Sequence, residues 1–284
     1  MNKIEIYKQR RSSTLLLVFI LLCFAVILSS CTREAIQKLP QRNWELAWSD
    51  EFTGAAGSLP DNTKWSFDIG TGDNGWGNQE LQYYTNRPSN VQLDGNGNLV
   101  ITARSESFSG SGFTSGRIKT QGKFAQQYGR FEARIQTPTG PGLWPAFWML
   151  GSNIDAVSWP QCGEIDIMEQ RGQEPNITHG SLHGPGYSAG NAITKAYQLP
   201  TGRFDTKFHV YAVEWGPDYV DFFVDNFLYK RATPADVTGQ WVYNTPFFII
   251  LNVAVGGAFV GFPTAGTPFP QSMIVDYVKV YKQK

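Results

Sequence analysis

The chain has 284 residues, of which 42% are hydrophobic and 17% are charged, a balance typical of a globular protein and not of a disordered one. Its 24 basic and 24 acidic side chains give a formal net charge of zero. No basic patch or run of like charge stands out, which argues against a nucleic acid as a partner. Roughly 250 residues follow the N-terminal segment, a length that suits one all-β domain.

The N-terminal segment has the features of a targeting signal. Residues 3–11 contain four basic side chains, and residues 14–28 are almost wholly apolar. About 15 apolar residues are few for a stable membrane span. Residues 28–31 (LSSC) resemble a bacterial lipobox, and this resemblance implies cleavage before Cys31 and lipidation of its thiol. The alternative is ordinary signal-peptide cleavage after a small residue.

These features predict an exported lipoprotein that is anchored to a membrane, in the periplasm or at the cell surface. We expect a signal peptide over 1–30, a lipidated N-terminus and tether over 31–42, and one domain over 43–284. Cys23 lies in the predicted signal peptide and Cys31 would bear the lipid, so Cys162 alone remains. The mature chain therefore has no intrachain disulfide, and we expect it to be a monomer.

The domain begins with patterns that are typical of β-strands. Residues 91–104 contain Asp94-Gly95-Asn96-Gly97-Asn98 between two strand-like runs, which indicates a hairpin. In residues 131–135 apolar side chains alternate with Glu132 and Arg134, which predicts a half-buried strand.

The same patterns continue to the end of the chain. Residues 220–229 predict a second hairpin that turns at Asp225-Asn226. Residues 247–255 form an apolar run typical of a strand buried on both faces, and residues 274–281 alternate again. No segment is typical of a long amphipathic helix. Many short strands joined by turn-rich segments predict an all-β, antiparallel β-sandwich or jelly roll.

Residues 164–169 (EIDIME) place three carboxylates in a strand that is otherwise apolar. Burying carboxylates in a strand is costly, so the arrangement requires an explanation. Glu164 and Asp166 point to the same face because they are two residues apart. A regular strand would turn Glu169 to the opposite face. A β-bulge near Ile167-Met168 would return Glu169 beside the other two and turn Met168 into the core.

Paired carboxylates on one face suit glycoside hydrolysis. A retaining enzyme needs its two carboxyl groups about 5–5.5 Å apart, and an inverting enzyme needs them roughly 6.5–9.5 Å apart. The strand spacing leaves the final separation open. A strand at a sheet edge, with its polar side chains turned to solvent, is the alternative reading of these residues.

A resemblance to glycoside hydrolase family 16 supports the catalytic reading. Residues 163–169 (GEIDIME) resemble the active-site signature of that family. Four further segments resemble its bacterial laminarinases: 48–52 (WSDEF), 76–84 (WGNQELQYY), 129–135 (GRFEARI) and 142–151 (GLWPAFWMLG). The resemblance covers nearly all of residues 44–284. It implies a concanavalin-like jelly roll with a concave substrate cleft and a retaining, double-displacement mechanism.

The resemblance also implies roles for individual residues. Glu164 is the expected nucleophile, Glu169 the general acid/base, and Asp166 their auxiliary. The resemblance further implies substrate-binding roles for Asn78, Gln82, Arg117, Trp144, Trp148, His183 and Phe259. The alternatives are core packing for the two Trp residues, a surface-loop position for Arg117 and a structural role for His183. Many laminarinases carry Trp where this chain has Phe259, which keeps an aromatic face but offers less area and no N–H donor.

Glu51, Gly95 and Asp276 match the positions that hold a structural calcium ion in many family members. Hard oxygen ligands from separate segments suit calcium. The alternative is a solvated Glu and an Asp at a strand end. No HExxH motif or Cys/His cluster accompanies these residues, so we expect no cofactor for catalysis.

The leading interpretation is an endo-hydrolase of β-1,3-glucan (laminarin-type) or of mixed β-1,3/1,4-glucan. The chain has 9 Trp, 12 Tyr and 19 Phe residues, some of which could form platforms for the apolar faces of sugars. One alternative is a family member that cleaves a marine galactan such as agarose. Another is a lectin-like jelly roll that binds sugar without cleaving it.

Overall fold

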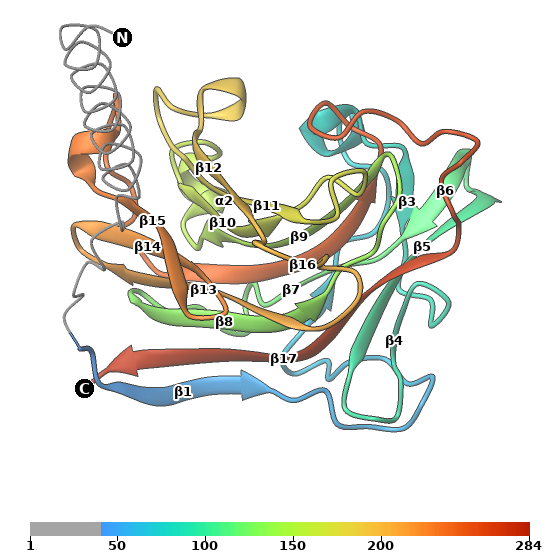
Figure 1. The fold of residues 1–284 in the computed structure, drawn as a ribbon, viewed down its shortest axis with the longest axis horizontal. Helices are drawn as coiled ribbons and strands as arrows, with labels where there is room; N and C mark the ends of the chain where they lie inside the picture. Colours follow the sequence, from blue (N-terminus) through green and yellow to red (C-terminus); the bar gives the residue numbers. More distant parts are fainter. Residues whose placement is uncertain (1–40) are drawn as a thin grey trace, which may run out of the picture. The chain divides into compact units, whose positions relative to one another are not determined.

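Two β-sheets pack against each other in residues 43–284 of this computed structural model, which describes residues 41–284 (Figure 1). The larger sheet has ten strands, and its strand pairs are antiparallel except for β3 with β6. Its main path runs through β15 (Phe227–Ala232), β14 (Tyr219–Val224), β13 (His209–Gly216), β8 (Gly129–Gln136), β17 (Gln271–Gln283), β5 (Leu99–Phe108), β6 (Ser111–Ser115) and β3 (Gln82–Tyr84). Off this path, β1 (Trp44–Asp50) pairs with β17, and β4 (Val91–Leu93) pairs with β5.

The second sheet has seven strands, and each of its neighbouring pairs is antiparallel. Its spatial order is β12 (Ile193–Gln198), β11 (Ile177–His183), β10 (Glu164–Glu169), β9 (Leu143–Gly151), β16 (Phe247–Val255), β7 (Arg117–Lys119) and β2 (Ser66–Phe67). The predicted antiparallel β-sandwich is therefore confirmed. The strand with the three carboxylates, β10, is an inner strand of its sheet, so the edge-strand alternative is wrong.

The core lies between the two sheets and is built by the alternation of side chains along each strand. In β9, Phe147 and Met149 face the core and are fully buried. Trp144 and Trp148 point to the other side of the seven-stranded sheet, because side chains of a strand alternate between its faces. We call this other side, which also carries Glu164 and Asp166, the site face.

The predicted strands and hairpins are present, with one difference in burial. Every residue of β16 is buried, as expected for an apolar run in the middle of a sheet. The two hairpins are the pairs β4–β5 and β14–β15. Strand β8 is more buried than predicted, because Arg130 Nε lies 2.8 Å from Glu132 Oε2 and both side chains are about nine-tenths covered. An ion pair thus allows the polar face of this strand to be buried.

The helical segments of the described residues are short, as the sequence predicts. They are η1 (Gly75–Gln79), α2 (Ile154–Val157), η2 (Ala189–Asn191) and η3 (Pro234–Asp236). In residues 41–284 none of the helices has the length and apolar character that crossing a membrane requires. The predicted signal peptide, Cys31 and the tether up to residue 40 lie outside the described residues and stay predictions.

Gly180 of β11 is a point of close contact between the sheets. A Cβ atom there would lie 2.3 Å from Tyr229 Oη and 2.6 Å from a ring carbon of Phe222, both in the ten-stranded sheet. We expect Gly180→Ala to lower the free energy of unfolding by about 1–3 kcal/mol through overpacking, measured by urea denaturation. Gly190→Ala is the control, because its Cβ would meet no atom within 4 Å. Equal losses in the two variants would contradict this packing.

Candidate active site

Strand β10 contains the irregularity that the carboxylate spacing predicts. Asp166 pairs with Trp148 of β9, while Glu169, three residues later, pairs with Ala146, only two residues away from Trp148. The pairing with β11 shifts between the same two carboxylates. The predicted β-bulge between Asp166 and Glu169 is therefore confirmed.

The bulge brings Glu169 to the site face. Ile167 and Met168 both point into the core, with 1% and 0% of their surface exposed. Glu169 Oε1 accepts a hydrogen bond of 2.9 Å from the indole Nε1 of Trp144, which lies on the site face. Without the extra residue, alternation would turn Glu169 towards the core. The three carboxylates therefore share one face.

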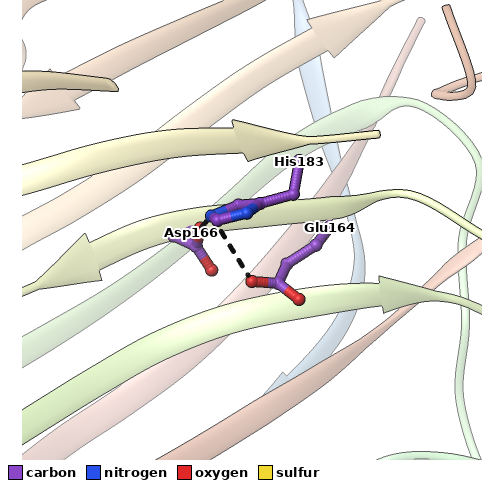
Figure 2. Close-up of side chains that lie close together, drawn as sticks. All are labelled: Glu164, Asp166 and His183. Carbon is purple, nitrogen blue, oxygen red and sulfur yellow. Dashed lines mark ion pairs between the residues drawn. The ribbon is translucent and has the colours of Figure 1, made fainter. Parts of the chain in front are cut away.

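His183, at the end of β11, lies against two of the carboxylates (Figure 2). Its Nε2 is 3.0 Å from Asp166 Oδ2 and 3.6 Å from Glu164 Oε1. Its Nδ1 accepts a hydrogen bond of 3.1 Å from the backbone N–H of Ala189. Since Nδ1 acts as the acceptor, a neutral ring has its proton on Nε2, facing the carboxylates. The structure thus brings His183 into the carboxylate cluster.

The cluster also has the composition of a metal site. One ligand atom each from Glu164, Asp166 and His183 lie within 4.8 Å of one another. Carboxylate oxygens and an imidazole nitrogen could hold a divalent ion. Hydrolysis by the carboxyl groups of Glu164 and Glu169 would need no metal.

Burial raises the pKa of all three carboxyl groups. The pKa of Glu164 lies well above its ordinary value because of burial and then because of the charge of Asp166. Burial raises the pKa of Asp166 to about 7, against the effects of its hydrogen bond with Glu164 and of the Lys230 charge. Burial and the Asp166 charge raise the pKa of Glu169 to about 8, while His183 acts in the opposite direction. Glu169, with a pKa of about 8, therefore keeps its proton at neutral pH.

A buried lysine, whose pKa burial lowers to about 7, contacts the core side of this part of the seven-stranded sheet. Lys230 of β15 donates hydrogen bonds from Nζ to the carbonyl oxygens of Gly180 (3.2 Å) and Ile193 (2.5 Å). Its side chain also packs over the ring of Phe222, with Nζ 4.6 Å from the ring centroid. Lys230 thus ties β11 and β12 to the other sheet, and its charge lowers the pKa of Asp166.

Trp144 offers an aromatic ring on the site face and also donates a hydrogen bond to Glu169. Its indole N–H stabilises the ionised form of Glu169, which lowers the pKa of that carboxyl. We expect Trp144→Phe to move the basic limb of the pH–rate profile to higher pH, because Glu169 would keep its proton longer. We expect kcat/KM on the plateau to fall by no more than about tenfold.

The control for this prediction is Trp148→Phe. The indole N–H of Trp148 donates to Asn252 Oδ1 at 2.7 Å and not to a carboxylate. This variant should keep the wild-type basic limb. A basic limb that moves equally in both variants, measured on the same substrate, would contradict the assigned contact.

Arg117 lies at the other end of the site face. Its guanidinium carbon is 4.5 Å from the ring centroid of Trp76 and 4.9 Å from that of Trp148. Its Nε is 2.8 Å from Asp68 Oδ2, and only 9% of its surface is exposed. The surface-loop alternative for Arg117 is therefore wrong, since the residue starts β7 and packs among aromatic rings.

Asn78 and Phe259 are brought together near Trp144. The backbone carbonyl of Asn78 accepts a hydrogen bond of 2.9 Å from the N–H of Ala258. The Phe259 ring lies 5.2 Å from the ring of Trp144, and the Arg171 guanidinium lies 4.4 Å from the Phe259 ring. The predicted aromatic position at Phe259 is thus part of the same surface as Trp144.

The structure corrects the placement of Gln82. This side chain is fully buried. Its Nε2 donates to Glu80 Oε2 at 2.7 Å, and its Oε1 accepts from the backbone N–H of Val255 at 2.7 Å. Both ends of the amide are therefore satisfied within the protein, so direct contact with a substrate is excluded in this arrangement. Gln82 instead links Glu80 to the backbone of β16.

Two residues of the site are absent from the sequence-based prediction. Trp159 is 42% exposed, and its Nε1 donates to Glu164 Oε2 at 2.9 Å. Its only sequence signal is an aromatic side chain five residues before the first carboxylate. Glu80 bonds Asn78 and Gln82. The sequence feature that could have revealed Glu80 is the alternation of polar residues Asn78, Glu80 and Gln82. Residues at every second position share a face of an extended segment.

The residues predicted to hold calcium do not form an acidic cluster. Glu51 Oε1 lies 3.1 Å from Lys279 Nζ, and Asp276 Oδ2 lies 2.5 Å from Arg134 Nη1. Among residues 41–284, neither carboxylate belongs to a group of three acidic, His or Cys side chains close enough to share an ion. The side chains as placed therefore do not fit a calcium cage, although Gly95 offers a backbone carbonyl in a tight turn.

Comparisons with known proteins agree with this geometry. The beta-glucanase of Rhodothermus marinus is 44% identical over 252 residues, which are 84% of this chain and 86% of that protein. The structure of the endo-beta-1,3-glucanase from Pyrococcus furiosus has 48% identity and a TM-score of 0.81, and the match covers 87% of this chain and 97% of that one. The laminarinase catalytic domain from Thermotoga maritima has 46% identity and a TM-score of 0.80, over 85% and 99% of the two chains.

A family model also matches the part of the chain that contains the three carboxylates. The model of the glycosyl hydrolases family 16 matches residues 78–278, a span that contains β10 and the bulge between Asp166 and Glu169. The matched span is well over half of the chain. This chain therefore belongs to glycosyl hydrolase family 16.

Proposed function

We propose that this chain is a retaining endo-hydrolase of β-1,3-glucan, or of mixed β-1,3/1,4-glucan. The bulged strand β10 carries this proposal, because it places Glu164, Asp166 and Glu169 on one face beside Trp144. Proteins named as β-glucanases and laminarinases share 44–48% identity with the chain, which supports the glucan as substrate.

In the first step Glu164 acts as the nucleophile and Glu169 as the acid. An oxygen of Glu164 forms a bond to the anomeric carbon while the bond from that carbon to the leaving oxygen breaks. The carboxyl proton of Glu169 passes to the leaving oxygen, which departs as a sugar hydroxyl. The pKa of about 8 for Glu169 keeps this proton available at neutral pH.

In the second step the covalent intermediate is hydrolysed. Glu169, now ionised, takes a proton from water as the water oxygen attacks the anomeric carbon. The bond between that carbon and Glu164 breaks, and the carboxylate is restored. Because each step inverts the anomeric carbon, the product keeps the configuration of the substrate.

Asp166 and two N–H groups prepare Glu164 for attack. Trp159 donates to one oxygen of Glu164, and the Nε2 of His183 faces the other. These donors favour the ionised form of Glu164. In the free site the hydrogen bond between the pair raises the pKa of Glu164 and lowers that of Asp166. Attack requires the ionised form of Glu164, so the proton shared by the pair must lie on Asp166, which is only 2% exposed, when Glu164 reacts. In this state Asp166 donates to Glu164 and holds its rotamer.

The aromatic and polar side chains around the carboxylates would bind the sugar chain. Trp144, Trp148 and Phe259 offer apolar faces on which pyranose rings can stack. Asn78 and Arg117, which both contact Trp76, offer polar groups to the sugar chain. An extended set of contacts of this kind suits cleavage within a polysaccharide.

The test is the stereochemistry and substrate range of hydrolysis. Proton NMR during hydrolysis of laminarin should show the β-anomer of the new reducing end first. An α-anomer that appears first would contradict the retaining mechanism. In parallel assays we expect activity on laminarin and lichenan, whereas activity on agarose alone would favour the galactan alternative. Binding to laminarin with no release of reducing ends would favour the lectin-like alternative.

Membrane attachment is a separate proposal that rests on residues 28–31. A lipid on Cys31 would anchor the enzyme, with residues 31–42 as the tether. The full-length chain produced in a bacterial host should enter the detergent phase on Triton X-114 partition, and Cys31→Ser should return it to the aqueous phase. An unmodified Cys31 in the mass spectrum of the mature chain would contradict lipidation.

The calcium site stays a prediction from the resemblance. Binding by the carboxylates of Glu51 or Asp276 would require displacing Lys279 or Arg134. The test is the melting temperature with calcium and with a chelator. A rise of several degrees with calcium, lost in Asp276→Asn, would support the site, and equal melting temperatures would remove it.

A further inference from the structure

Glu80 is a half-buried carboxylate whose hydrogen bonds all come from the protein. Its Oε1 accepts from Asn78 Nδ2 at 3.3 Å. Its Oε2 accepts from Gln82 Nε2 at 2.7 Å and from Tyr84 Oη at 3.2 Å. Three protein donors are therefore directed at this one carboxylate. It is the common acceptor of a polar network.

The donor and acceptor roles in this network are set by its two terminal groups, the indole N–H of Trp148 and the carboxylate of Glu80. The indole of Trp148 can only donate, and it bonds Asn252 Oδ1 at 2.7 Å. The amide of Asn252 then donates from Nδ2 to Tyr84 Oη at 3.1 Å, and Tyr84 donates to Glu80. An ionised carboxylate can only accept, so each amide and hydroxyl in the series has one consistent orientation.

Asn78 is the member of the network that borders the substrate surface. Its Nδ2 is directed at Glu80 Oε1 and also lies 3.5 Å from the carbonyl oxygen of Trp76. Its backbone carbonyl accepts from Ala258, so the main chain is held as well. Among the described residues, none donates a hydrogen bond to Asn78 Oδ1. The amide nitrogen is therefore committed inward, and the oxygen remains for an external donor.

We propose that Glu80 is a positioning residue that determines which atom of Asn78 meets the substrate. By holding the amide nitrogen inward, it presents Oδ1 as an acceptor, so this position selects a sugar hydroxyl that donates a hydrogen bond. The inference rests on the proposed glucan hydrolase function and on the contact of Asn78 with substrate. Burial raises the pKa of Glu80, and a neutral Glu80 could donate to Asn78 and release this orientation.

The first test is Glu80→Gln, assayed with laminarin oligosaccharides. A glutamine at this position has only one acceptor oxygen for the three donors. Its NH2 group is itself a donor, so it cannot accept the hydrogen bond from the NH2 group of Asn78. We expect KM to rise about 3- to 20-fold with kcat within about twofold, because a binding contact is lost and the carboxylates are untouched. Glu106→Gln is the matched control, since Glu106 of β5 also accepts hydrogen bonds from protein donors, Arg87 and Thr114.

The second test exchanges the amide and the carboxylate between positions 78 and 80, so that position 80 donates and position 78 accepts. In the combined variant Asn78→Asp with Glu80→Gln, the glutamine NH2 can donate to one oxygen of the aspartate, and its other oxygen can face the substrate. We expect KM to return to within about threefold of the wild type. The single variant Asn78→Asp should bind worse than the combined one, because it places two carboxylates side by side.

The outcomes separate this inference from the proposed function. Wild-type protein that does not hydrolyse laminarin would overturn both. An active wild type with an unchanged KM in Glu80→Gln would overturn only the role of Glu80. So would a Glu80→Gln variant in which kcat falls as much as kcat/KM and the combined variant gives no recovery, because that pattern indicates a structural role alone.

Discussion

Replacing Glu164 with alanine is expected to lower kcat on laminarin by about 10⁴-fold or more, because no other group can form the bond to the anomeric carbon. Glu164 stands at the start of β10 and is contacted by Trp159 and His183. The loss should occur without unfolding, since its side chain lies on the site face and not in the core. Circular dichroism and melting temperature check the fold, and initial rates on laminarin check the activity.

Azide distinguishes a nucleophile from a residue that only supports one. In Glu164→Ala the removed carboxylate leaves room for the anion beside the anomeric carbon. With an activated aryl β-glucoside, azide should restore turnover and yield the α-glycosyl azide, through one inversion. Formation of the β-glycosyl azide by Glu164→Ala would contradict this assignment.

Replacing Glu169 with glutamine should lower kcat on laminarin by about 10²- to 10⁴-fold, because the leaving oxygen would depart without a proton. The wild-type rate should fall as the pH rises through the Glu169 pKa of about 8, since the ionised carboxyl cannot act as the acid. The variant should lose this basic limb. Rates on laminarin between pH 4 and 10 measure both effects.

A leaving group that needs no proton provides the control for Glu169. With a dinitrophenyl glycoside the first step should be nearly as fast in Glu169→Gln as in the wild type, and a burst of dinitrophenol should precede slow turnover. A variant that is equally impaired on laminarin and on the activated substrate, with no burst, would show that Glu169 does not act as the acid.

The strand β10 shows how far sequence reasoning reaches. Three carboxylates interleaved with apolar residues predict a single polar face only if the strand contains an extra residue, and the register shift is found at that place. This succeeded because alternation is a local property of an extended chain. The buried strand over 247–255 and the two hairpins were predictable for the same reason.

The site around the strand was less predictable. Gln82 belongs to a recognisable motif, but whether it faces the substrate or lies beneath it depends on Val255, which is 173 positions away in the chain. Trp159 reaches Glu164 because of the path of a loop. The burial of Arg130 and Glu132 depends on partners from other strands, Glu214 among them. The contacts of Gln82 with Val255 and of Arg130 with Glu214 have no local signature.

The sequence alone therefore determined the all-β class, the bulge, and the three carboxylates with their shared face, because these follow from side-chain alternation and turn chemistry within a few residues. Tertiary structure decided which polar side chains face outward, how His183 and Trp159 meet Glu164, and how Glu80 orients Asn78. Hydrogen-bond polarity and burial depend on groups that only the packed sheets bring together.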